Sequence, residues 1–351
     1  MDADLIERSY MVSRRGLILG LAATAMASGV RQAAAQPEAD WRRVSSGGGP
    51  AARWDHTLSA HAARKELLVA FGRDAAGTPL GDSWVTDRSS GEWAPLNVSG
   101  PSARFGHAVA SDDASGLIYL FGGQQDDLFF NELWVLDLDA GRWELLAAGD
   151  AGPSPRYGTS LVHDGAGSLY VSHGFTFEGR FDDTWRFDLA TATWDDASPP
   201  ADTRPLKRCL HEAVWDDTAG AMWLYGGCSS GFGPCPQGDL WRFEPDAGSW
   251  KNVPLSGPAA RSNPSLVLEP VDNRLVLFAG LAENGSANDL WIGSPTDDTM
   301  TWEAVSPGAD GPSARSSHDA VISGGALYLF GGLGPDGPLG DLWRLKLGDP
   351  A

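Results

Sequence analysis

RFGHAVASDDASGLIYLFGGQQDDLFFNELWVLDLDAGRWELL, residues 104–146, is the stretch that decides the fold. It opens on Arg104, and its apolar run ends at Gly122-Gly123. An acidic residue then precedes Trp134 by two positions, and a second tryptophan, Trp143, comes near the end. Because short apolar segments alternate here with turn residues, the stretch predicts four antiparallel strands.

The same pattern occurs six times along the 351-residue chain, and the copies begin 51 to 54 residues apart. A fixed period near this length is typical of propellers and solenoids, in which each sheet buries its faces against its neighbours. Five copies carry two tryptophans, which we expect to pack between neighbouring sheets. The opening residues of the copies are Arg53, Arg104, Arg156, Arg208, Arg261 and Arg315.

The second copy, with its Arg-Phe-Gly-His start, Gly-Gly pair and two tryptophans, resembles the Kelch repeat family. The resemblance covers residues 40–348 and implies an all-β propeller. It says little about function, because one fold hosts enzymes, ligand-binding proteins and interaction modules.

Six blades are predicted, with the last one completed by the amino-terminal end. The sixth copy lacks its outer strand, whereas Trp41 and its neighbours match the outer strand around Trp302. A strand at residues 41–45 therefore closes the ring and removes an open edge. The predicted blades span residues 53–96, 104–146, 156–197, 208–253, 261–305 and 315–347 together with 41–45.

Residues 1–35 are predicted to be an export signal, cleaved after Ala35, ahead of a propeller at 36–351. A basic start with Arg14-Arg15 precedes an apolar stretch and a run of three alanines. The twin arginines resemble a twin-arginine (Tat) signal. A general secretory signal is the alternative, and either predicts a periplasmic or extracellular protein.

The net charge of −20 disfavours some partners. Binding to nucleic acids or to anionic membranes depends on clustered Lys and Arg, which this chain lacks. We expect no membrane span in the mature protein, no cofactor, no metal site and a monomer.

The six arginines are candidates for ligand binding. The resemblance places them around one face, where matching arginines of some Kelch domains bind acidic peptides. Each copy, however, also has an acid two residues before its first tryptophan, so six structural ion pairs are the alternative. These acids are Asp82, Glu132, Asp183, Asp239, Asp289 and Asp341.

Aromatic side chains single out the first three blades on that same face. The residue after the arginine is aromatic there and small in the other three blades, and aromatic residues beside arginines suit a sugar, an aromatic acid or a peptide. Two departures from the Gly-Gly pair add polar groups. The additional candidate ligand-binding residues are Trp54, Arg73, Phe105, Tyr157, His173 and Phe175.

The three cysteines all lie in the fourth copy. In an exported protein we expect them to form a disulfide, and Cys228 with Cys235 is the favoured pair. Cys209 with Cys228 is the second, because sequence does not reveal connectivity.

A non-catalytic propeller that binds an acidic or aromatic small ligand, a glycan, or a protein or peptide is the favoured function. A mutarotase acting on a sialic-acid-like sugar is the enzymatic alternative, with Glu212 beside a nearby arginine as the weak catalytic candidate. A scaffold exported together with a folded partner is the second alternative.

Overall fold

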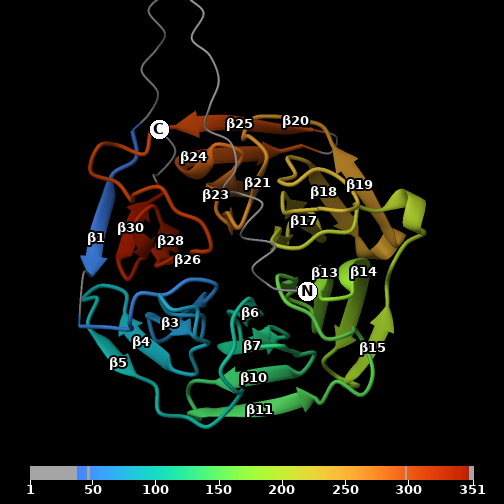
Figure 1. Cartoon of the computed structure of the whole chain (residues 1–351), viewed down its shortest axis with the longest axis horizontal. Coiled ribbons are helices and arrows are strands. Elements are labelled where there is room, and N and C mark those ends of the chain that lie inside the picture. The colour runs from blue at the N-terminus through green and yellow to red at the C-terminus, as the bar shows by residue number, and fades with distance from the viewer. Residues whose placement is uncertain (1–37, 46–47, 297–298, 348–351) are drawn as a thin grey trace, which may run out of the picture. The chain divides into compact units, whose positions relative to one another are not determined.

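The computed structural model describes residues 38–45, 48–296 and 299–347 of the chain. The predicted export signal, residues 1–35, lies outside the described residues. The described part forms six four-stranded blades around a central axis, as Figure 1 shows. The six-bladed, all-β prediction is confirmed.

Each of the first three blades is an antiparallel sheet built from consecutive segments. Their turns carry the Gly and Asp residues that the sequence pattern places between apolar runs. Blade 1 comprises β2 (Thr57–His61), β3 (Glu66–Ala70), β4 (Ser83–Asp87) and β5 (Trp93–Pro95). Blade 2 comprises β6 (Ala108–Asp112), β7 (Leu117–Phe121), β10 (Leu133–Asp137) and β11 (Arg142–Ala147), with the short hairpin β8 (Gln124–Gln125) and β9 (Leu128–Phe129). Blade 3 comprises β12 (Ser160–His163), β13 (Ser168–Thr176), β14 (Gly179–Asp188) and β15 (Thr193–Asp196).

The last three blades repeat this order with small additions. Blade 4 comprises β16 (Glu212–Asp216), β17 (Ala221–Tyr225), β18 (Leu240–Glu244) and β19 (Ser249–Val253), with the 3₁₀ turns η1 (Ala201–Thr203) and η2 (Pro245–Ala247) nearby in sequence. Blade 5 comprises β22 (Ser265–Glu269), β23 (Arg274–Ala282), β24 (Gly285–Pro295) and β25 (Met300–Val305), extended by β20 (Leu255–Ser256) and β21 (Arg261–Ser262). Blade 6 comprises β26 (Asp319–Ser323), β27 (Ala326–Phe330) and β30 (Leu342–Lys346), with the hairpin β28 (Leu333–Gly334) and β29 (Gly337–Pro338).

The ring closes where the sequence predicts. Strand β1 (Trp41–Ser45) pairs antiparallel with β30 and supplies the outer strand of blade 6, with Trp41 opposite Leu345. In Figure 1 the blue β1 lies beside the red β30. Trp41 also packs on Phe278 of blade 5, with ring centroids 5.2 Å apart.

The outer tryptophan of each blade packs against the preceding blade, as predicted. The partner is usually the aromatic residue at the end of the second strand, such as Phe71 for Trp143 and Phe330 for Trp93. Burying such a side chain contributes about 2–3 kcal/mol. The first tryptophan behaves differently from the prediction, because its indole N–H donates to the acid two residues earlier in its own blade, as Trp185 does to Asp183.

Candidate functional site

All six opening arginines are locked inside their own blades. Each is at most 1% exposed, and each guanidinium donates to the acid two residues before the first tryptophan. Arg156, for example, donates to Asp183 at 2.6 and 2.8 Å and to the carbonyl of His173 at 2.8 Å. The structure therefore matches the ion-pair alternative, and no guanidinium of the set Arg53, Arg104, Arg156, Arg208, Arg261 and Arg315 reaches the surface.

The acid, the arginine and the indole form one unit in each blade. Although burial alone would raise it, the pKa of Asp183 is lowered below its ordinary value by Arg156 and by the Trp185 N–H. Charge-assisted pairs of this kind are strong and directional. The guanidinium N–H groups in these pairs are therefore not free to bind the carboxylate of a ligand.

The residue after each arginine does lie at the predicted face. Its backbone pairs with the loop between the second and third strands, as Trp54 does with Arg73 and Tyr157 with Phe175. In blades 1 to 3 these residues bring aromatic rings together. We call this set the loop-face aromatic patch, and it consists of Trp54, Phe105, Phe129, Tyr157, Phe175 and Phe177.

Edge-to-face contacts hold most of the patch rigid. The ring centroids of Phe129 and Phe177 are 4.8 Å apart, and those of Tyr157 and Phe175 are 5.7 Å apart. Tyr157 is 8% exposed, and burial raises the pKa of its hydroxyl. Phe177, by contrast, is 50% exposed and presents an apolar surface to solvent.

Two arginines flank the patch. Arg73 lies 3.4 Å from the ring centroid of Trp54 and 4.4 Å from that of Phe105, and it pairs with Asp55 at 2.8 Å. Arg180 lies over Phe175 and donates to the carbonyl of Ser230, and no ion pair to it is found among the described residues. Among the described residues, Arg180 is thus the cation of the patch that forms no ion pair with a carboxylate.

His173 and the three cysteines are not members of the loop-face aromatic patch. The side chain of His173 is fully buried against His211 and Trp250, so it does not join the patch. Cys228 and Cys235 form a disulfide beside the patch, and Cys209 is a buried free thiol.

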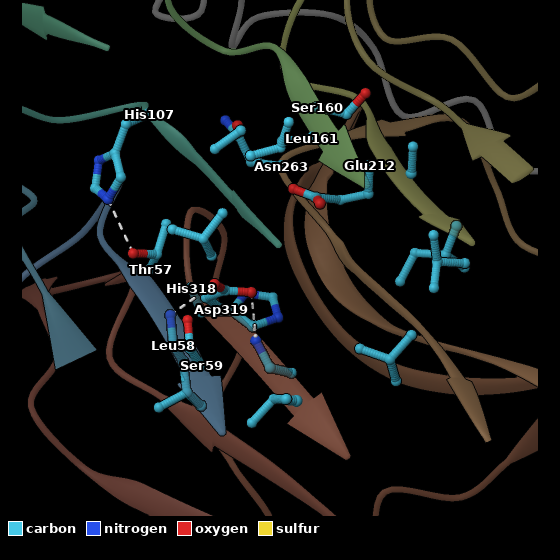
Figure 2. A pocket seen from close by; sticks show the side chains of 18 of the residues that line it. Thr57, Leu58, Ser59, His107, Ser160, Leu161, Glu212, Asn263, His318 and Asp319 are labelled. Carbon is cyan, nitrogen blue, oxygen red and sulfur yellow. Dashed lines mark hydrogen bonds between the residues drawn. The ribbon is translucent and has the colours of Figure 1, made fainter. Parts of the chain in front are cut away.

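Glu212 lies in a different place, the central channel. A cavity of about 320 Å³ is lined by the inner strands of several blades, and Glu212 and Asp319 both reach into it (Figure 2). Burial, then the charge of Asp319, raises the pKa of Glu212 well above its ordinary value. Burial raises that of Asp319 to about 7, although two backbone N–H groups donate to it.

The mutarotase alternative requires a cation beside that carboxyl. Among the described residues that line the cavity there is no Arg or Lys. Its four histidines have lowered pKa values, chiefly through burial, and are neutral near pH 7. The channel thus offers a proton-holding carboxyl without a partner for a sugar carboxylate.

Asp319 and a ring of backbone hydrogen bonds escaped sequence reasoning. The residue two positions after each arginine has a positive φ and donates its N–H to the equivalent residue of the preceding blade, over 2.8–3.2 Å. These six residues, the backbone ring, are Asp55, Gly106, Gly158, Leu210, Asn263 and Ser317.

A comparison of the fourth residue after each arginine would have identified Asp319, because only there and at Glu212 is that residue acidic.

In the described part of the chain, no helix is long and apolar enough to span a membrane. No group of three or more His, Cys, Asp or Glu side chains within the described ranges is arranged to hold a metal ion.

The chain belongs to the Kelch-repeat propellers. Residues 36–227 and 215–350 match the family described as the KLHDC2/KLHL20/DRC7 Kelch-repeats domain. Among curated relatives, a putative adagio-like protein 2 of Oryza sativa subsp. japonica is 29% identical over 88% of this chain and 51% of its own length.

Two further relatives are similar over less of the chain. Adagio protein 3 of Arabidopsis thaliana is 29% identical over 80% of this chain and 48% of its own length. Kelch domain-containing protein 3 of Bos taurus is 25% identical over 67% and 62%. The chain spans about half the length of the adagio relatives it matches.

Proposed function

We propose that this protein is an exported, non-catalytic Kelch propeller that binds a protein or peptide partner on its loop-face aromatic patch. The observation that carries the proposal is the convergence of aromatic side chains from three adjacent blades, with Phe177 half exposed at their edge. Rigid aromatic side chains lose little conformational entropy on binding and dominate protein interfaces.

The charges around the patch favour a partner that carries a carboxylate near an aromatic or aliphatic side chain. Arg180 forms no ion pair with a described acid, and Lys207 lies over the exposed ring of Phe232 on the adjoining loop. In a protein of net charge −20, two such cations make a local site of opposite sign. Leu128, which is 58% exposed, extends the apolar area beside Phe129.

Export is the part of the proposal that depends chiefly on residues 1–35. The basic start, the apolar stretch and the alanine run support it. A disulfide between Cys228 and Cys235 is also what an oxidising compartment favours.

A peptide-display selection against the full chain tests the binding proposal. We expect enriched peptides to combine aromatic with acidic residues, and to bind the Phe177→Ala/Arg180→Ala variant at least tenfold more weakly. The matched control is Val271→Ala/Arg142→Ala, which removes an exposed apolar side chain from a turn and an exposed cation from the start of β11. Equal binding to both double variants, or selective binding of a neutral glycan array instead, would contradict the proposal.

A further inference from the structure

The carboxyl of Glu212 lacks the hydrogen-bond partner that equivalent side chains have at the contacts between neighbouring blades, which we call seams. In three seams a histidine three residues after the arginine hydrogen-bonds a hydroxyl of the preceding blade, as His211 does with Ser160 at 3.1 Å. The other two such pairs are His107 with Thr57 and His318 with Ser265. These hydroxyls occupy the fourth position after the arginine, which is also the position of Glu212.

Across the seam from Glu212, the equivalent of the histidine is Pro264, which has no side-chain donor. No hydrogen bond or ion pair reaches the carboxyl of Glu212 from any described residue. Figure 2 shows this carboxyl directed into the cavity, on the side where Asn263 and Ser160 also lie. Glu212 is partly buried at the wall of this cavity, so its unpaired carboxyl is available to a ligand that enters it.

The rest of the cavity wall also favours positive charge. Asp319 faces the same space and Asp113 lines one end of it, whereas Asp55, at the other end, is already paired with Arg73. No Lys or Arg is found in the described lining. The histidines of the wall, His56, His107, His211 and His318, are neutral because burial lowers their pKa values. The hydroxyls of Thr57 and Ser160 are already engaged by histidines.

The two ends of the channel differ in their lining. The backbone ring lines the loop-face end, where six consecutive N–H···O=C bonds join its residues just before the inner strands begin. A second cavity adjoins the first at the other end of these strands and shares Val109, Asp113 and Val214 with it. Asp112, Asp113 and Asp217 line that second cavity, so the electrostatic potential there attracts cations.

We propose that the central channel binds a small organic cation, with an ammonium or guanidinium group seated between Glu212 and Asp319. The cavity volume, about 320 Å³, is at the lower end of the range for small-molecule sites. The cation compensates the carboxyl that the protein leaves unpaired, and Asn263 supplies an amide beside it. This site is separate from the loop-face aromatic patch, so either proposal can fail without the other.

Calorimetric titration of the full chain with n-butylammonium and n-butylguanidinium chloride tests the proposal, with n-butanol as the neutral probe of similar shape. We expect at least one cation to bind and the alcohol not to bind. Binding should tighten severalfold from pH 6 to pH 8, because the carboxyls release their protons more readily at the higher pH. Binding that is independent of pH, or equal for the alcohol, would overturn the proposal.

Two variants assign the site. Glu212→Gln keeps the shape of the side chain and should weaken cation binding at least tenfold, whereas Glu283→Gln, an exposed acid at the β23–β24 turn, should leave it unchanged. Asp319→Asn provides a second, independent test and should also weaken binding. Unchanged affinity in both channel variants would overturn the proposal, as would calcium chloride binding in place of the organic cations.

Discussion

Asp183 accepts two hydrogen bonds from Arg156 and a third from the indole of Trp185, and the same three-residue unit occurs in all six blades. The unit ties the start of a blade to its third strand. It explains why the sequence repeats an arginine, an acid and a tryptophan at fixed spacing. The most regular residues of this chain therefore build the scaffold, and the irregular ones form its candidate sites.

Removing one member of this unit should unfold the protein readily. Arg156→Met leaves Asp183 without its partner, and breaking a buried pair from one side costs about 3–5 kcal/mol. Urea unfolding followed by tryptophan fluorescence measures the loss. The exposed pair of Arg42 with Asp40 is the control, since Asp40→Asn should change the free energy of unfolding by less than about 1 kcal/mol. A small effect of Arg156→Met on the free energy of unfolding would contradict this structural role of the arginine.

Closure by the amino-terminal strand should be as strong as any internal seam. Trp41 is 7% exposed and Trp302 is 8% exposed, and each packs on the preceding blade. Trp41→Ala and Trp302→Ala should each lower the free energy of unfolding by about 3–5 kcal/mol, the usual cost of truncating a buried tryptophan. If Trp41→Ala proved nearly neutral in denaturant melts while Trp302→Ala did not, β1 would not be holding the ring closed.

Stability should fall as pH rises from 7 to 8, and Glu212 should be a cause. The folded protein keeps protons on Glu212 and on Asp319, whose pKa is raised to about 7, that the unfolded chain releases at lower pH. Because the folded state binds more protons in this window, raising the pH favours unfolding. The buried histidines act with the opposite sign, but the unfolded chain releases most of their protons as pH rises from the ordinary histidine pKa of 6.5 to about 7.5, so their contribution fades within this window.

Glu212→Gln should weaken this pH dependence. At pH 8 the variant should exceed the wild type in free energy of unfolding by about 1–3 kcal/mol, because glutamine has no proton whose retention becomes more costly as the pH rises. Thermal melts at pH 7, 7.5 and 8 measure the difference, and Glu283→Gln serves as the control. A wild-type curve that is flat or rising between pH 7 and 8 would contradict the assignment of raised pKa values.

Thiol counting should distinguish Cys209 from the disulfide pair. Cys209 is 2% exposed, so the native protein without reductant should show no reactive thiol. One thiol should appear in denaturant, and three after reduction. Replacing Cys228 and Cys235 by serine should cost about 2–3 kcal/mol in the chain-entropy account of short loops. Three thiols in unreduced, denatured protein would show that the pair is not formed.

The sequence could predict the features that each blade determines by itself. Trp41 matches Trp302 in local pattern, and Arg156 and Asp183 belong to one copy, so ring closure and the ion pairs could both be predicted. The contacts between neighbouring blades could not be predicted, because they depend on which residues of different copies meet. His173 illustrates this limit: it stands at a glycine position with φ of 56°, and its ring turns inward between blades rather than to the face. Glu212 likewise stands out only when it is compared with Pro264, which occupies the histidine position of the next blade.

A photo-crosslinking residue tests the central claim, that the loop-face aromatic patch binds a protein partner, most directly. p-Benzoylphenylalanine would replace Phe177, or Val271 on a distant turn, in the full chain expressed in its native host. The account predicts a discrete protein adduct from position 177, lost when Arg180→Ala is added, and none from position 271. Adducts of equal yield from both positions, or from position 271 alone, would contradict it.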